Sequence, residues 1–549
     1  MKHTFKFIFA ALMLIAACKS DQNAEMPAST EPVFDWNNAT VYFLLTDRFQ
    51  NGDQGNDFQV VEGQEAAPFR GFMGGDLQGV TQKIEEGYFT DLGVDAIWTT
   101  PVVQNIDGFV DEGTGKSYGF HGYWTKDWTV IEPKLGGEEA FRKFVDAAHS
   151  KGIKVIVDVV LNHTGPVTEL DPVWPKEWVR TEPQCVYKDE ETTVSCTLVK
   201  NLPDIRTEDD STEVTLPEGL VAKWKEEGRY DQEMAELDAF FASTGYPRTP
   251  TNYIIKWLTD FVTEFGVDGF RVDTAKHVEA SVWKKLWEQA KLAFERYKKQ
   301  HPETRYDGSE FYMVGEVYGY GAGGGQMYDY GDSKVNFFDN GFNSLINFGY
   351  KYDANETMQA FHEKYDSILS GDLNGKYILN YLSSHDDGSP WDKDRSKTYE
   401  AANRLLLSQG GAQIYYGDET GRSLTVAAEG DAVLRSPMNW EDITSRDSTK
   451  MLLEHWQKIG KFRHLHPAVG AGKHQTLSAE PYVFSRTYAA SEDIVVVGLG
   501  LAKGAKTLPV DATIADGTVL KDHYSQTTAK VKNGKIEIDT PFDLVLLSK

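Results

Sequence analysis

The nine residues Gly269-Phe-Arg-Val-Asp-Thr-Ala-Lys-His277 decide how this chain is understood. A short apolar strand ends here by presenting Arg271 and, two residues on, Asp273. Alternation along a strand sends both side chains to the same side, so the guanidinium can keep the carboxylate ionised. An ionised aspartate at the end of a buried strand is what a covalent nucleophile requires. For this peptide alone, a purely structural Arg–Asp pair is the alternative.

Short β-rich runs alternate with amphipathic helical patterns along most of the chain. Several of the runs are almost continuously apolar, as expected for strands that are covered on both faces. Eight strands with intervening helices predict an α/β fold, a (β/α)8 TIM barrel. The predicted strands are residues 41–49, 94–99, 153–160, 269–273, 311–317, 335–338, 377–382 and 412–416.

The stretch between the third and fourth predicted strands, residues 162–250, is too long for a simple loop. Loops longer than about 12–15 residues without structure of their own are uncommon, so we expect a subdomain inserted after strand 3. It divides the catalytic barrel into residues 35–161 and 251–468. Short alternating strands separated by turns then predict a C-terminal antiparallel β domain at residues 469–549.

The N-terminus indicates export. Lys2 and Lys6 precede an apolar run, residues 7–17, that is too short to span a bilayer and is typical of a secretory signal. The run ends Leu14-Ile-Ala-Ala-Cys18, which resembles a bacterial lipoprotein signal. This resemblance implies a signal peptide at 1–18 with Cys18 lipidated, followed by a tether at 19–34. The mature protein would be an outer-membrane lipoprotein, periplasmic or on the cell surface. It would contact the membrane only through its lipid. A plain cleaved signal with an incidental cysteine is the alternative.

The composition is that of a globular, acidic protein. Of 549 residues, 40% are apolar and 25% are charged, and the formal net charge is −27 at pH 7. Because no basic run could grip phosphates, we expect no nucleic-acid partner. Cys185 and Cys196 lie in one polar stretch and are predicted to form a disulfide after export, whereas a metal pair would need histidines nearby.

Four of the predicted strands end in a carboxylate or a histidine, at residues 158–163, 271–273, 315–317 and 384–386. Burial would penalise such groups if they had no partners. In a (β/α)8 barrel the carboxyl ends of the strands meet at one mouth, where catalytic groups lie. One such ending could be structural, but four that converge indicate a functional site.

These residues resemble the α-amylase family of glycoside hydrolases over nearly all of the mature chain. The segments DVVLNH (158–163), GFRVDTAKH (269–277), GEV (315–317) and HD (385–386) occur in the family's order. Three lesser segments, at 93–101, 202–205 and 411–419, agree as well. The pair Ser383-Ser384 departs from the Glu-Asn or Thr-Asn that many members carry at these positions. The departure affects the details of the sugar-binding subsites and leaves the three acidic residues unchanged.

The resemblance implies that Asp273 is the nucleophile and Glu316 the general acid/base. Asp386 would be a third carboxylate that binds sugar hydroxyls and distorts the ring. Glu316 has no adjacent cation in the sequence, so we expect a raised pKa among neighbouring carboxylates. The nucleophile and the acid should then lie about 5–5.5 Å apart, and the anomeric configuration should be retained.

Further residues match positions of the family that surround the scissile bond. Matched histidines would hydrogen-bond hydroxyls of the sugar, an aromatic face would stack on the glucose ring, and a Lys-His pair would lie on the leaving-group side. The predicted substrate-binding residues are His121, Tyr123, His163, Arg271, Lys276, His277 and His385.

Calcium is the predicted cofactor. Asn162 and Asp204 match ligands of the family's calcium site between barrel and subdomain, with the backbone carbonyl of His277 as a third. Mixed carboxylate, amide and carbonyl oxygens are what calcium prefers, whereas zinc would need a histidine–cysteine cluster. A second candidate loop resembles a calcium loop of some members, with an ordinary polar turn as the alternative. Its residues are Asn51, Asp53, Asn56, Asp57, Gly74 and Asp76.

The resemblance implies a retaining hydrolase that cleaves internal α-1,4-glucosidic bonds in starch, glycogen or maltodextrins by double displacement. Lys276-His277 after the nucleophile and Val317 after the acid favour an α-amylase over other members. A maltodextrin transglycosylase, or a cyclomaltodextrinase-like activity, is the alternative within the family. A non-catalytic glucan-binding lipoprotein is the rival from another class, but such relatives lose the carboxylates that this chain keeps.

Overall fold

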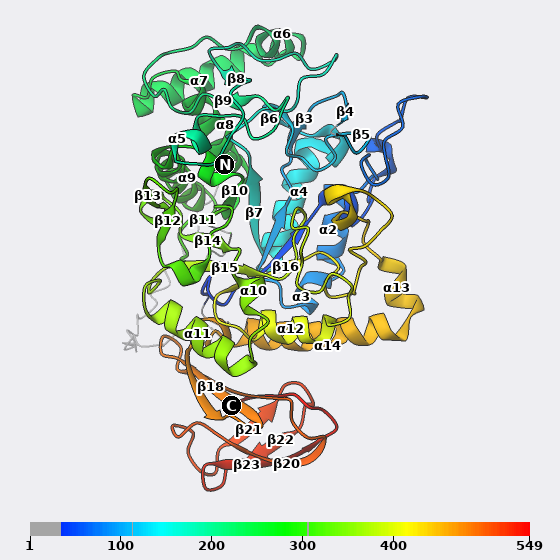
Figure 1. Ribbon diagram of the computed structural model, residues 1–549, viewed down its shortest axis with the longest axis vertical. Helices are drawn as coiled ribbons and strands as arrows, with labels where there is room; N and C mark the ends of the chain where they lie inside the picture. Colours follow the sequence, from blue (N-terminus) through cyan, green and yellow to red (C-terminus); the bar gives the residue numbers. More distant parts are fainter. Residues whose placement is uncertain (1–33, 112, 303, 305–306) are drawn as a thin grey trace, which may run out of the picture.

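The computed structural model describes residues 34–549 apart from 112, 303 and 305–306. Eight parallel strands close into a barrel in the order β1-β16-β15-β14-β11-β10-β7-β2, so the predicted (β/α)8 fold is confirmed (Figure 1). The predicted signal peptide, Cys18 and the tether up to residue 33 lie outside the described residues. The barrel strands are β1 (Thr40–Leu44), β2 (Ala96–Thr99), β7 (Lys154–Val159), β10 (Gly269–Val272), β11 (Tyr312–Gly315), β14 (Ser344–Asn347), β15 (Tyr377–Tyr381) and β16 (Gly411–Tyr415).

The sixth barrel strand differs from the prediction. Residues 335–338 were expected there because of their apolar and aromatic character, but the barrel uses β14, in which all four residues are buried. Val335 instead lies in β13 (Lys334–Asn336), which pairs antiparallel with β12 (Met327–Asp329), and Phe337 begins a short 3-10 turn. Both phenylalanines of that turn are buried in side-chain packing. The apolar character of these residues therefore predicted their burial correctly but predicted the wrong kind of element.

Amphipathic helices cover the barrel. Helix α4 (Gly137–Ser150) buries the stripe Phe141, Phe144, Val145 and Ala148, as its spacing predicts. Helix α8 (Pro250–Phe265) begins after Thr249, whose hydroxyl accepts a bond from Asn252 N, and ends at Gly266 in the left-handed region. The other helices of this part are α1 (Thr46–Phe49), α2 (Leu77–Glu85), α3 (Tyr88–Asp91), α9 (Ala280–Gln300), α10 (Tyr350–Asp353), α11 (Met358–Ser370), α12 (Thr398–Leu406), α13 (Trp440–Ser445), α14 (Asp447–Leu465) and α15 (Ala468–Ala471).

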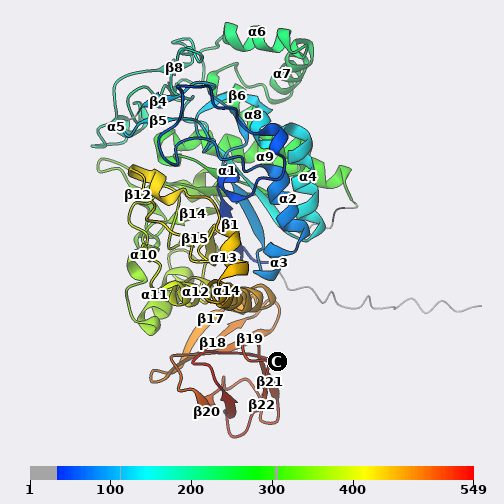
Figure 2. The ribbon, with the colours of Figure 1, turned by 90° about the vertical axis from the view of Figure 1, so that its right-hand side faces the viewer.

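A subdomain follows β7 and covers one end of the barrel, at the top of Figures 1 and 2. It contains the short pair β8 (Val179–Arg180) and β9 (Asp204–Ile205), and the disulfide between Cys185 and Cys196 is formed. Its helices are α5 (Glu191–Val194), α6 (Glu218–Glu226) and α7 (Tyr230–Thr244). A smaller strand pair, β3 (Val103–Asn105) with β6 (Thr125–Ile131), lies beside it.

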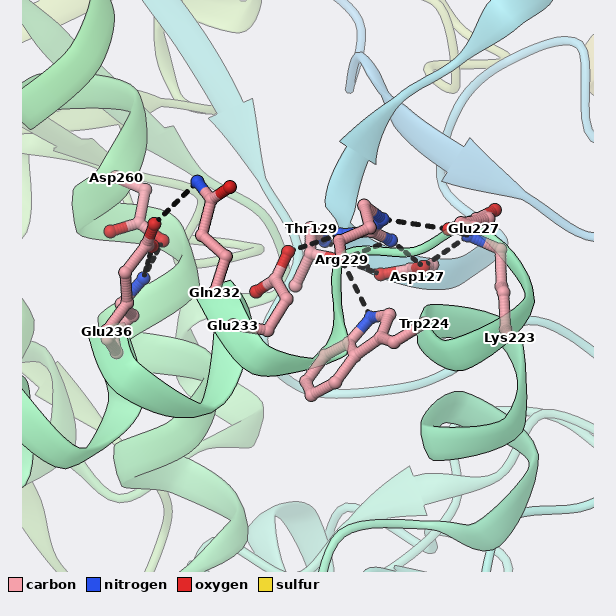
Figure 3. Close-up of polar contacts among 11 residues, drawn as sticks. Asp127, Thr129, Lys223, Trp224, Glu227, Arg229, Gln232, Glu233, Glu236 and Asp260 are labelled. Atoms are coloured by element: carbon pink, nitrogen blue, oxygen red, sulfur yellow. Dashed lines mark hydrogen bonds and ion pairs between the residues drawn. The ribbon is translucent and has the colours of Figure 1, made fainter.

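Ion pairs fasten this subdomain to the barrel (Figure 3). Asp127 of β6 is buried and accepts contacts from Lys223 at 2.6 Å and Arg229 at 3.4 Å, both from the α6–α7 region. On α8, Lys256 bonds Glu236 of α7 at 2.8 Å and Asp260 at 2.7 Å. A cavity of about 600 Å³ lies between these elements. Most carboxylates of its lining pair with Arg229, Lys256 or Arg142, and we assign the cavity a role in joining subdomain and barrel.

The C-terminal residues form a separate antiparallel β unit beyond the long helix α14, as predicted (Figures 1 and 2). Its main sheet has six strands in the order β17-β18-β19-β24-β21-β22, and β20 pairs with β23. Alternating burial along β23 gives it one apolar and one solvent-facing side. The strands are β17 (Lys473–Ser478), β18 (Tyr482–Tyr488), β19 (Asp493–Leu499), β20 (Gly504–Pro509), β21 (Val519–Asp522), β22 (Thr528–Lys530), β23 (Lys535–Thr540) and β24 (Val545–Ser548).

Over the part of the chain that the structure describes, no helix combines the length and apolar character needed to cross a membrane.

Candidate active site

One buried arginine organises the carboxyl ends of three neighbouring strands. Arg271 is 1% exposed, and its Nη1 lies 2.8 Å from Asp273 Oδ1. Its Nη2 lies 3.0 Å from Glu316 Oε2. The predicted pairing of Arg271 with Asp273 is therefore present, and the same guanidinium also reaches the carboxylate at the end of β11. A planar fork with several donors suits this shared role better than a lysine would.

Asp158 is a third partner of Arg271, and the sequence prediction did not include it in the site. Its two carboxylate oxygens lie 2.9 and 3.1 Å from Nη1 of the arginine. Trp98 Nε1 and the Tyr123 hydroxyl also donate to it, at 3.0 and 2.7 Å. Burial raises its pKa to about 7, although Arg271 opposes the shift. The signal was available, because Asp158 opens the strand-three segment that contains His163.

Glu316 has the protonation behaviour of a general acid. Burial raises its pKa to about 8, and nearby Asp273 adds to the effect while Arg271 opposes it. Glu316 has no adjacent cation in the sequence, but in space Arg271 reaches it from the adjacent strand. Burial nevertheless prevails, and the raised pKa that the sequence predicts is present.

A strained residue completes the surroundings of Glu316. Thr274 follows Asp273 directly and has φ +48°, which is uncommon for a β-branched residue. In this conformation its backbone N–H donates to Glu316 Oε2 at 2.8 Å. The strain therefore points a hydrogen-bond donor at the acid, as expected for backbone strain held in place by a site.

Asp386 lies in the turn that follows β15. Its charge contributes to the raised pKa of Glu316, so the two groups are near enough to interact. Burial opposes ionisation of Asp386, but its side chain is 42% exposed. His385 and Arg271 therefore prevail and hold its pKa below the usual value. The pKa values of Glu316 and Asp386 are therefore shifted in opposite directions at one mouth of the barrel.

The predicted sugar-binding histidines lie around these acids. His163 is buried, and its Nε2 lies 3.1 Å from the Tyr123 carbonyl oxygen. His385 stacks on the Tyr123 ring with 5.2 Å between ring centroids, and burial lowers its pKa to about 4. His121 Nδ1 accepts from Tyr123 N at 3.1 Å. Neutral imidazoles suit hydrogen bonding to uncharged hydroxyls.

Lys276 and His277 lie on one side of Glu316, beside a cavity of about 370 Å³. Lys276 Nζ donates to the Tyr318 carbonyl at 3.3 Å, and His277 Nδ1 lies 2.9 Å from Thr193 O in the subdomain. The lining includes two aromatic residues that the sequence prediction missed, Tyr187 and Tyr318, which are 53% and 62% exposed. Exposed aromatic rings at a cleft can contact the apolar faces of sugar rings.

The first predicted calcium site passes a test of its donor atoms. Asn162 and Asp204 are adjacent in space, since Ile205 N donates to Asn162 O at 2.7 Å. Asn162 Oδ1 and both Asp204 oxygens are buried and make no hydrogen bond with any described residue, although Arg180 Nε lies 3.0 Å from Asp204. Burial raises the pKa of Asp204 well above its usual value. Orphaned buried oxygens of these types fit a hard cation.

The second candidate loop satisfies most of its carboxylates internally. Asp76 caps α2 and also accepts from Gly52 N and Asp53 N at 3.1 and 2.8 Å. Asn51 Nδ2 donates to Asp57 Oδ1 at 2.8 Å. In the described ranges, no group of three or more His, Cys, Asp or Glu side chains is arranged to hold a metal. A polar turn explains these contacts, but Asn51 Oδ1 and Asn56 Oδ1 are buried without a hydrogen-bond partner among the described residues, and calcium in this loop stays a prediction.

Comparison with known proteins agrees with this geometry. The model of the alpha-amylase catalytic domain matches residues 43–462, and the chain therefore belongs to the α-amylase family. It is 33% identical over 546 residues to the periplasmic alpha-amylase of Escherichia coli (strain K12), covering 88% of this chain and 74% of that protein.

Other relatives come from more than one activity class. The chain is 26% identical over 511 residues to a cyclomaltodextrin glucanotransferase of Geobacillus stearothermophilus, covering 90% of this chain and 64% of the relative. Among solved structures, an Anoxybacillus alpha-amylase superimposes with a TM-score of 0.66 at 21% identity, over 94% of this chain and 99% of that one. At this identity the likeness supports the fold alone.

Proposed function

We propose that this protein is a retaining glycoside hydrolase that cleaves internal α-1,4-glucosidic bonds of starch, glycogen or maltodextrins. The observation that carries the proposal is one buried guanidinium between Asp273 and Glu316, together with a pKa of about 8 at Glu316. At neutral pH the protonated acid can donate to the glycosidic oxygen, and the guanidinium holds Asp273 Oδ1 at 2.8 Å for attack.

In the proposed mechanism, an Asp273 oxygen attacks the anomeric carbon as Glu316 transfers its proton to the departing glycosidic oxygen. A covalent glycosyl–aspartate forms, and the shortened glucan leaves past Lys276 and His277. Glu316, now ionised, then takes a proton from water as that water attacks the anomeric carbon, which releases Asp273. Asp386 binds sugar hydroxyls and favours a distorted ring. Two displacements retain the configuration, which NMR of the first-formed product tests.

Asp273→Asn tests the central role. The variant should lose hydrolysis of starch and keep binding of maltoheptaose, because the amide cannot form the glycosyl ester. Asp260→Asn is a matched control, since it removes an ion-paired carboxylate in α8, away from the strand ends. Turnover by Asp273→Asn at the wild-type rate would remove the mechanism.

Transfer of maltodextrins to sugar acceptors is the second candidate, because cyclomaltodextrin glucanotransferases are among the relatives. Retaining chemistry allows a sugar hydroxyl to replace water in the second displacement. Product sizing on maltoheptaose separates the two: early appearance of longer chains favours transfer, and shorter chains alone favour hydrolysis. Starch, pullulan and cyclodextrin should be compared in the same assay.

Calcium is the proposed structural cofactor, held by Asn162, Asp204 and the backbone carbonyl of His277. It would fix the subdomain beside the cleft and take no part in bond cleavage. We also propose export, which the signal-like N-terminus and the relative described as periplasmic support. Lipidation of Cys18 and outer-membrane anchoring are part of this proposal, and mass spectrometry of the mature N-terminus with protease treatment of whole cells tests them.

A further inference from the structure

The side chain of Asp386 makes few contacts that could fix its position. Its Oδ1 lies 3.4 Å from Ser384 Oγ and 3.8 Å from His385 Nδ1, and the side chain is 42% exposed. By contrast, Asp273 and Glu316 are each paired with buried Arg271. The position of Asp386 therefore depends on the backbone of the turn that carries it.

That turn is held from both sides by cations of other elements. On one side, Arg435 Nε donates to the carbonyl oxygen of His385 at 3.0 Å, and Asp431 fixes the arginine at 2.6 Å. On the other side, the residue after Asp386 is Asp387, and both of its carboxylate oxygens bond Lys351 Nζ. Asp386 lies between the two clamps.

The Lys351–Asp387 pair is buried and specific. Their side chains are 7% and 12% exposed. Lys351 also donates to Ser389 O at 3.1 Å, while the Tyr381 hydroxyl donates to Asp387 Oδ2 at 3.1 Å. A buried ammonium without its partner would be strongly unfavourable, so each partner constrains the other. Because α10 follows β14 directly, the pair ties the ends of the sixth and seventh barrel strands together.

We propose that Lys351, acting through Asp387, is a positioning residue that sets the placement of Asp386 toward the substrate. The inference rests on the proposed function and adds a residue to it. Neither Lys351 nor Asp387 belongs to the strand-end motifs. Loss of the pair frees one end of the turn, and misplacement of a catalytic group by about 1 Å can lower the rate about 100-fold.

Lys351→Met tests this with a side chain of similar length and no charge. We expect kcat on maltoheptaose to fall about 10- to 100-fold while KM changes less than about twofold, and Lys351→Arg should recover most of the loss. Lys256→Met is the matched control, because Lys256 is similarly buried, at 6% exposed, and its ammonium also bonds carboxylate oxygens, those of Glu236 and Asp260. It should lower the melting temperature and leave kcat unchanged.

A double variant separates positioning from general damage. If Lys351 acts through Asp386, adding Lys351→Met to Asp386→Asn should lower the residual rate by less than about twofold. Equal losses in both backgrounds, or a folded Lys351→Met enzyme with wild-type kcat, overturn the inference. If wild-type protein cleaves no α-glucan, the proposed function itself fails. Wild-type activity that Asp273→Asn abolishes, with Lys351→Met unaffected, removes only the positioning role.

Discussion

Glu316→Gln should make the protein more stable at neutral and alkaline pH. In the unfolded chain Glu316 titrates near its ordinary pKa of 4.5, whereas burial raises the pKa in the folded protein to about 8. Because the folded pKa is the higher one, the unfolded chain releases this proton from about pH 4.5 while the folded protein keeps it until about pH 8, so the folding stability falls across this window and the loss is complete near pH 8. At about 1.4 kcal/mol per pKa unit, the loss of folding stability is on the order of 3–5 kcal/mol. Glutamine cannot ionise and removes it.

The assay is calorimetric unfolding of both proteins at about pH 4.5, 6 and 8. The melting temperature of Glu316→Gln should exceed that of the wild type most at the alkaline end, and the difference should vanish at the acid end. Glu310→Gln is the control, since Glu310 is 61% exposed and pairs with Lys291 at the surface. A difference in melting temperature that is constant with pH, or a less stable Gln variant at pH 8, would show that folding does not raise the pKa of Glu316.

The pKa of Glu316 also predicts the pH dependence of catalysis: kcat/KM of the wild type should fall above about pH 8 as Glu316 loses its proton. The measurement is a pH profile on a chromogenic maltooligosaccharide. An alkaline limb near pH 5 would contradict the assignment of Glu316 as the acid. Metal removal should act on stability: EDTA should lower the melting temperature of the wild type and calcium should restore it. Asp204→Asn, which loses the negative charge and one of the two orphaned oxygens, should respond much less to either. An equal EDTA response in the variant would place the relevant metal elsewhere.

The sequence was most informative where a motif and a strand period coincide. Alternation along residues 269–273 placed Arg271 beside Asp273, and the ion pair is present at 2.8 Å. The helical stripe of Phe141 and Phe144 is buried as its spacing predicts. These features depend on neighbours within a few residues, so local geometry is enough to infer them.

The sixth strand shows where local patterns end. Residues 335–338 are more aromatic than Ser344–Asn347, yet the latter occupy the barrel because they pair with β11 and β15. Strand membership is decided by hydrogen bonding to both neighbours, and several apolar segments compete for that place. Apolar character alone therefore chose the wrong segment.

The amino-acid sequence by itself determined the acidic residues at the strand ends, the histidines beside them and the family to which the chain belongs. Only the tertiary structure decided that Arg271 serves Asp158 and Glu316 as well as Asp273, and that Lys351 meets Asp387 across two strands. The physical reason is that charge pairing and burial act over a few ångströms in space, and the closed barrel brings together strands that are far apart along the chain.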